Sequence, residues 1–154
     1  MKNIILIGMP ACGKSSVGVI LAKTAAMSFV DTDLLLQEKE GRKLQYIIDD
    51  QGRILSSVNA ENAVISTGGS AVYSEGAMAH LKSVGTVVYL KLSLSEIDRR
   101  LKNIKTRGIA MGPGETLADL YDYRVPLYER YADITIDAEG LTIEETIAEI
   151  LKRV

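Results

Sequence analysis

The chain has 154 residues, with 18 Lys or Arg against 20 Asp or Glu and one His, so its formal net charge at pH 7 is −2. This balance lacks the clustered basic excess typical of nucleic-acid or anionic-membrane binding, and no apolar run approaches the roughly 20 residues of a membrane span. The only cysteine, Cys12, excludes an internal disulfide. We therefore expect one globular domain over residues 1–154, monomeric and cytoplasmic, with no nucleic-acid or membrane partner.

Strand-like segments and helical patterns alternate along the chain. The predicted strands are aliphatic or β-branched runs at residues 4–7, 29–30, 63–67, 86–90 and 134–136. The predicted helices cover residues 14–26, 34–40, 43–50, 93–102, 117–128 and 142–153. Ser93 with Glu96, and Thr142 with Glu145, have the spacing of capping boxes. Pro126 is expected to interrupt the helix at 117–128.

The order of these elements predicts an α/β sandwich with a mainly parallel central sheet. Strands of such a sheet are buried on both faces. Their sequences are therefore continuous aliphatic runs and do not alternate between apolar and polar residues. Ligands of such folds bind at the carboxyl ends of the strands. We therefore expect residues 8–15, 31–33, 68–70 and the segment after Leu90 to share one rim.

A phosphate-binding motif follows the first predicted strand. Residues 8–15, Gly-Met-Pro-Ala-Cys-Gly-Lys-Ser, match G-x-x-x-x-G-K-[ST] in full. Its glycines let backbone N–H groups surround a phosphate chain, Lys14 adds a positive charge, and Ser15 offers a hydroxyl to Mg²⁺. The alternative is a glycine turn with a solvated lysine.

Two carboxylates follow the second predicted strand. Asp31 and Asp33 are two residues apart, so both side chains point to the same side. Beside a phosphate site, one carboxylate suits Mg²⁺ and the other is free to accept a hydroxyl proton. Alternatively, Asp33 only caps the next helix.

Taken together, these motifs resemble the shikimate kinase family over most of the chain. The likeness rests, in family order, on residues 8–15, Asp-Thr-Asp at 31–33, Gly-Gly at 68–69, Arg107 in a glycine-rich stretch and Arg-Val-Pro-Leu-Tyr at 124–128. The resemblance implies a three-layer sandwich of the P-loop NTPase type, with five parallel strands in the order 2-3-1-4-5. It also implies an acceptor-binding segment at about 33–62, a lid at about 103–115, and transfer of the ATP γ-phosphoryl group to shikimate with Mg²⁺.

The resemblance assigns roles residue by residue. ATP would be bound by Gly8, Ala11, Cys12, Gly13, Lys14, Ser15, Ser16, Arg100 and Arg107. The acceptor would be bound by Asp33, Gly68, Gly69 and Arg124, and the metal by Ser15 and Asp31. Asp33 resembles the residue at the accepting hydroxyl, Arg107 a lid arginine that reaches the phosphates, and Lys14 completes the catalytic set. Arg100 resembles the residue that flanks adenine, and Arg124 one that grips the carboxylate.

Each arginine also has a purely structural interpretation. Arg100 would then be a solvated residue at the carboxyl end of its helix, and Arg107 a loop residue that aids solubility. Arg124 would pair with Asp122 or Glu129 at the surface. A reacting triphosphate, however, needs several cations, which favours the functional interpretation.

The chain departs from the family at three places. The segment between Gly52 and Gly68 is short and offers no match to the family's F-R-x-x-E motif, whose arginine is a second clamp on the acceptor carboxylate. Ser70 replaces a third glycine, and residues 107–110 read Arg-Gly-Ile-Ala where the family has R-P-L-L. A same-fold kinase for another small alcohol or a hydroxy or amino acid, and a non-catalytic nucleotide-binding regulator, therefore remain as alternatives.

Overall fold

The computed structural model describes residues 3–32, 61–68, 71–102 and 116–154. Several sequence predictions fall outside these ranges. They are the helices at 34–40 and 43–50, most of the acceptor-binding segment, the lid, and the site residues Asp33, Gly69 and Arg107.

The framework is a five-stranded sheet in the order β2-β3-β1-β4-β5, in which all neighbouring strands are parallel. The strands are β1 (Asn3–Ile7), β2 (Ser28–Asp31), β3 (Ala63–Ser66), β4 (Gly85–Lys91) and β5 (Ile134–Asp137). This confirms the predicted α/β class and strand order. All residues of the central strand β1 are buried, because layers on both sides cover it.

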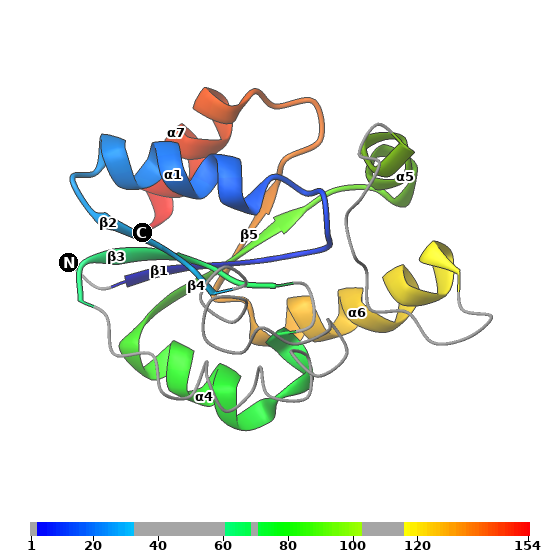
Figure 1. Ribbon diagram of the computed structural model, residues 1–154, viewed down its shortest axis with the longest axis horizontal. Coiled ribbons are helices and arrows are strands. Elements are labelled where there is room, and N and C mark those ends of the chain that lie inside the picture. Colours follow the sequence, from blue (N-terminus) through cyan, green and yellow to red (C-terminus); the bar gives the residue numbers. More distant parts are fainter. Residues whose placement is uncertain (1–2, 33–60, 69–70, 103–115) are drawn as a thin grey trace, which may run out of the picture.

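Helices lie on both faces of this sheet (Figure 1). The described helices are α1 (Lys14–Thr24), α4 (Glu75–Val84), α5 (Leu94–Lys102), α6 (Leu117–Tyr131) and α7 (Ile143–Arg153), with a short 3₁₀ turn η1 (Ala71–Tyr73). In Figure 1, α1 and α7 cover one face, and α4 and α6 cover the other. In the part of the chain described here, no helix is long and apolar enough to cross a membrane.

The core joins these layers through fully buried aliphatic side chains. Leu21 of α1, Leu81 of α4 and Ile150 of α7 each have 0% of their surface exposed. They pack against the central strands, where Ile5 of β1 lies between Ile65 of β3 and Val87 of β4. Burial of large aliphatic side chains is worth about 1.5–3 kcal/mol each, so this core holds the carboxyl ends of the strands in place.

Of the two capping boxes predicted from the sequence, one is complete and the other forms only in part. The Thr142–Glu145 capping box at the start of α7 is complete. At α5, Ser93 Oγ accepts a hydrogen bond from Glu96 N at 3.3 Å, but the Glu96 carboxylate does not return to the Ser93 amide. That amide donates to Glu139 Oε2 at 2.9 Å. The second half of the predicted box at Ser93 is therefore wrong, because Arg99 and Arg100 take up the Glu96 carboxylate.

Helix α6 is continuous through Pro126, which corrects the predicted interruption. A proline inside a helix removes the hydrogen bond to the carbonyl four residues earlier, here that of Asp122. Both residues are exposed, so water can satisfy this carbonyl. The helix also extends past the predicted end at Tyr128 to Tyr131.

Candidate active site

The turn between β1 and α1 has a backbone that depends on two glycines. Gly8 has a φ of 152° and Gly13 a φ of 95°. A Cβ atom on Gly8 would lie 2.8 Å from Cys12 Sγ and 2.9 Å from the carbonyl oxygen of Leu90. Gly13 is the N-cap of α1 in the left-handed conformation. The loop thus curls in front of a helix N-terminus, where free N–H groups and the helix dipole favour an anion.

Lys14 lies inside this curl. It is the first residue of α1 and is buried. Its Nζ donates to the carbonyl oxygen of Gly8 at 2.7 Å and to that of Met9 at 2.9 Å, and it lies 3.7 Å from Cys12 Sγ. The alternative of a solvated lysine is therefore wrong. The ammonium group is a positive charge positioned by the loop itself.

Ser15 and Asp31 meet beside the loop. Ser15 Oγ donates to Asp31 Oδ2 at 3.1 Å, which joins the start of α1 to the end of β2. Hydroxyl and carboxylate oxygens are the hard ligands that Mg²⁺ prefers, and this ion usually keeps several waters and binds phosphate oxygens. No group of three or more His, Cys, Asp or Glu among the described residues is arranged to hold a metal. The pair therefore fits a Mg²⁺ ion held mainly by phosphate and water.

A pocket of about 230 Å³ adjoins the loop on the side of α7. Its walls come from the loop and start of α1, from Arg100 of α5, and from the β5–α7 connection: Cys12, Gly13, Ser16, Val17, Arg100, Ala138, Leu141, Ile143 and Thr146. This mixture of aliphatic and polar groups beside a phosphate-binding loop suits a flat nucleoside. The family resemblance placed Arg100 and Ser16 near the nucleotide but did not identify the residues from the β5–α7 connection, which carry no motif.

Arg100 is held against the loop from two sides. Its Nη1 donates to the carbonyl oxygen of Ala11 at 3.2 Å, and its Nε donates to Glu96 Oε1 at 3.0 Å. Hydrogen bonds from Arg99 and from Arg100 lower the pKa of Glu96 to about 2. Arg100 is thus fixed beside the pocket. The alternative, a solvated arginine at the carboxyl end of its helix, does not account for these two contacts.

Buried threonines connect the strand ends at the same rim. Thr67 Oγ1 donates to the carbonyl oxygen of Leu6 at 2.8 Å, and Thr32 Oγ1 donates to that of Ser66 at 3.3 Å. Gly68, predicted to contact the acceptor, is buried directly after Thr67. These threonines were not predicted from the sequence, because a threonine after a strand is common and gives no specific signal.

Arg124 is buried in α6, with 1% of its surface exposed. Its Nε donates to Tyr73 Oη at 2.8 Å, and its Cζ lies 5.1 Å from the centroid of the Tyr73 ring. No carboxylate of the described residues is within ion-pair distance of this guanidinium, and Glu129 pairs with Lys91 at 3.4 Å. The alternative of a surface ion pair is therefore wrong for Arg124. A buried cation of this kind is costly unless a partner compensates its charge.

Two tyrosines extend this buried region toward the loop. The rings of Tyr128 and Tyr89 stack with their centroids 5.2 Å apart. Burial raises the pKa of both hydroxyls above the ordinary value, although Arg124 lowers that of Tyr128 in part. Both side chains therefore stay neutral at physiological pH. They belong to the same buried cluster as Cys12 of the loop.

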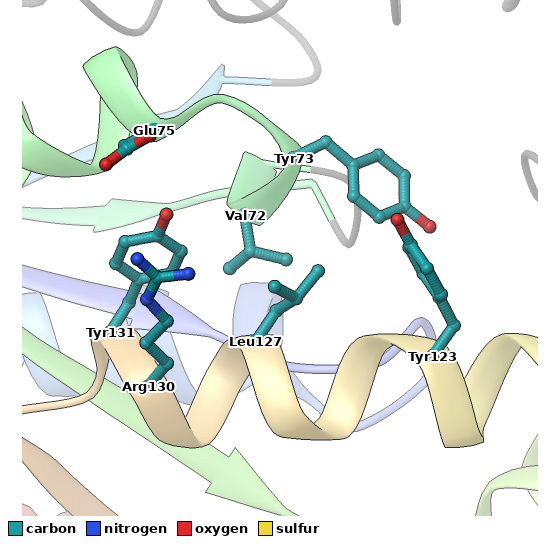
Figure 2. A pocket seen from close by; sticks show the side chains of 7 residues that line it. All are labelled: Val72, Tyr73, Glu75, Tyr123, Leu127, Arg130 and Tyr131. Atoms are coloured by element: carbon teal, nitrogen blue, oxygen red, sulfur yellow. The ribbon is translucent and has the colours of Figure 1, made fainter.

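A second, more open pocket of about 360 Å³ lies between η1, α4 and α6. In Figure 2 the phenol rings of Tyr73 and Tyr123 converge at one end, Val72 and Leu127 line the middle, and Glu75, Arg130 and Tyr131 line the other end. The ring centroids of Tyr73 and Tyr123 are 5.8 Å apart. The pocket therefore begins beside the tyrosine that contacts Arg124.

The fold and the loop together define the class of P-loop kinases. A family profile described as "Shikimate kinase" matches residues 10–154. The chain is 38% identical to a shikimate kinase of Sulfurihydrogenibium sp., covering 100% of this chain and 98% of the relative, and 36% identical to one of Thermodesulfovibrio yellowstonii, covering 99% and 94%. The chain belongs to the shikimate kinase family.

Solved structures agree with this assignment. A shikimate kinase from Acinetobacter baumannii, in complex with shikimate, is 28% identical and superposes with a TM-score of 0.78, covering 99% of this chain and 92% of that one. The enzyme from Aquifex aeolicus is 30% identical, with a TM-score of 0.76 over 97% and 94% of the two chains. The alignment with the Sulfurihydrogenibium relative spans 164 positions, more than the 154 residues of this chain. The alignment therefore contains gaps in this chain.

Proposed function

We propose that the protein transfers the γ-phosphoryl group of ATP to a ring hydroxyl of shikimate. The observation that supports this most directly is a buried guanidinium, Arg124, in a chain that also has a complete phosphate loop and belongs to the shikimate kinase family. A planar, charged fork of this kind suits the carboxylate of shikimate. The relative from Acinetobacter baumannii, solved in complex with shikimate, supports the choice of acceptor.

The loop would hold the triphosphate. Its inward N–H groups and the N-terminus of α1 stabilise the negative charge, and Lys14 exchanges its bonds to the carbonyl oxygens of Gly8 and Met9 for bonds to phosphate oxygens. The pocket beside Arg100 would take the nucleoside, with Ala11, Cys12, Gly13 and Ser16 at the loop side.

Ser15 and Asp31 would hold Mg²⁺, Asp31 through a water molecule. When bound, Mg²⁺ neutralises charge on the β- and γ-phosphates. Ser15 donates its hydroxyl hydrogen to Asp31, so the lone pairs of its oxygen would be available to the metal.

On the acceptor side, Asp33 would orient the hydroxyl and accept its proton, and Arg107 would approach the phosphates from the lid. Gly68 and Gly69 would let the backbone approach the acceptor ring, and Arg124 would bind its carboxylate. Chemistry in such a site is mainly positioning and charge neutralisation. The monomeric state, the single domain and the cytoplasmic location expected from the sequence remain predictions.

A panel of acceptors tests the proposal. ADP release is followed with shikimate, gluconate and serine, each with ATP and Mg²⁺, and phosphorylated shikimate is identified by mass spectrometry. We expect turnover with shikimate, loss of turnover in Asp33→Asn with ATP binding retained, and little change in Asp122→Asn, whose side chain is exposed. Turnover with gluconate or serine but not shikimate would indicate another acceptor. ATP binding with no acceptor-dependent ADP release would indicate a regulator.

A further inference from the structure

We propose that the hydroxyl of Tyr73 is a second ligand for the acceptor carboxylate and acts together with Arg124. The inference deepens the proposed function and rests on it. Tyr73 ends η1, directly after the strand and glycines that approach the acceptor, whereas Arg124 lies on α6. The hydrogen bond between them therefore joins two elements, both of which the proposed function places at the acceptor.

The direction of this hydrogen bond leaves the Tyr73 hydroxyl with a hydrogen to donate. Arg124 has only donors, so Tyr73 Oη accepts from Nε at 2.8 Å and must direct its own hydrogen elsewhere. The part of the chain that the structure describes provides no acceptor for that hydrogen. The phenol therefore presents a donor beside a guanidinium that has no carboxylate partner among the same residues.

The geometry of the guanidinium selects the kind of ligand. Because Nε is bonded to Tyr73, the two Nη groups remain for Tyr128 and for a ligand. The Nη–H beside Nε and the Tyr73 hydroxyl lie on the same side of the guanidinium, so both can donate to one carboxylate oxygen. Tyr73 as a residue is 43% exposed, so a ligand can approach its side chain without unfolding of η1.

This assignment also accounts for a gap in the sequence. The segment between Gly52 and Gly68 contains Arg53 but no F-R-x-x-E motif, whose arginine the resemblance makes a second carboxylate clamp. A neutral donor at Tyr73 supplies a second contact to the carboxylate without adding another buried charge, which would be costly to desolvate.

The test compares Tyr73→Phe with the matched variant Tyr123→Phe. Both keep an aromatic ring in the same contact, at 5.8 Å between centroids, but only the first removes the hydroxyl bonded to Arg124. We expect Tyr73→Phe to raise the KM for shikimate about tenfold, with kcat and the KM for ATP within twofold of the wild type, as for loss of a hydrogen bond to a charged group. Tyr123→Phe should leave all three unchanged.

Calorimetric binding of shikimate and its methyl ester separates carboxylate recognition from a structural role. Tyr73→Phe should weaken binding of shikimate about tenfold but leave that of the uncharged ester unchanged. Equal weakening for both ligands, an unchanged affinity for shikimate, or a lowered KM would overturn the inference. The last result would mean that Tyr73 competes with the carboxylate for Arg124.

If the proposed function is wrong, these experiments give a different set of results. If the wild type neither binds nor phosphorylates shikimate, the proposed function is wrong, and benzoate then serves as a simple carboxylate probe. The Arg124 Nε–H signal is followed by NMR during benzoate titration of both proteins. Weaker benzoate binding in Tyr73→Phe would still support the shared carboxylate site, and equal binding would refute it.

Discussion

At the scale of single residues, the phosphate loop depends on positions where no side chain fits. Gly8 combines a φ of 152° with a Cβ position 2.8 Å from Cys12 Sγ. We expect Gly8→Ala to lower the free energy of unfolding by about 1–3 kcal/mol, as in other overpacked sites, and to abolish ATP binding. Chemical denaturation and calorimetry measure the two effects.

Gly76 is the matched control for this prediction. It lies in the first turn of α4, and a Cβ there would meet nothing within 4 Å. Gly76→Ala should raise stability by about 0.5–1 kcal/mol, because alanine is the better helix former. Similar effects of the two substitutions would show that the loop does not require its glycine.

The contact between Ser15 and Asp31 leads to a prediction on metal dependence. Ser15→Ala removes the hydroxyl that joins the loop to β2 at 3.1 Å. We expect the Mg²⁺ concentration for half-maximal activity to rise at least tenfold, because loss of a group that only orients a metal ligand already costs about 10–100-fold and Ser15 is a proposed ligand. Activity is measured against free Mg²⁺ at saturating ATP. Ser28→Ala, at the exposed start of β2, should leave the Mg²⁺ dependence unchanged, and an unchanged value for Ser15→Ala would argue against the metal site.

Residue motifs allowed much of this site to be predicted, because their chemistry is local. The loop and the carboxylates beside it follow from spacing along one segment or one rim, whereas the choice of Asp31 for the metal and the position of Arg100 came from the family resemblance. Tyr73 was not predicted, since its contact with Arg124 spans 51 positions in the sequence and no motif includes it.

At the scale of elements, α5 acts as a support for Arg100. Glu96 accepts hydrogen bonds from Arg99 and from Arg100, and these lower the pKa of its carboxyl group to about 2. Because the folded pKa lies below the ordinary value of 4.5, the carboxylate contributes to stability fully above about pH 4.5. This contribution is lost as the pH falls toward about 2.

Glu96→Gln tests this support. The difference in Tm between the wild type and the variant should be constant from pH 5 to pH 8 and should shrink as the pH falls below about 4.5. The KM for ATP should also rise a few-fold, because Arg100 loses its anchor. Asp98→Asn, which breaks an ion pair of α5 with Lys102, should leave the KM for ATP unchanged. A Tm difference that grows on acidification would contradict the assigned interaction.

Helix boundaries were harder to predict than the presence of most helices, although the six predicted helices do not include α4. Ser93 and Glu96 have the spacing of a capping box, but the box is incomplete. The Ser93 amide donates to Glu139, and the Glu96 carboxylate accepts from two arginines. Pro126 usually interrupts a helix, but its exposed position lets α6 continue. Both outcomes depend on neighbours distant in sequence or on solvent, which local patterns do not contain.

At the scale of the whole molecule, the alternation of buried strands and helices was enough to predict the class of fold. The order of the strands, by contrast, came from the family resemblance, since parallel connections allow several arrangements. The sheet brings the carboxyl ends of β1, β2 and β3 together, and with them the loop, Asp31 and Gly68. The fold thus places groups from three separate segments along one rim.

The central claim is that the bend between β1 and α1 binds the triphosphate of ATP through its amides and Lys14. Calorimetric titration of the wild type with ATP in the presence of Mg²⁺ tests it most directly, with Lys14→Met and Lys23→Met compared under the same conditions. Lys23 is exposed at the end of the same helix and serves as the control. We expect clear binding heat for the wild type and for Lys23→Met, and an affinity for ATP reduced at least tenfold for Lys14→Met. Absence of binding by the wild type, or equal affinities of all three proteins, would contradict it.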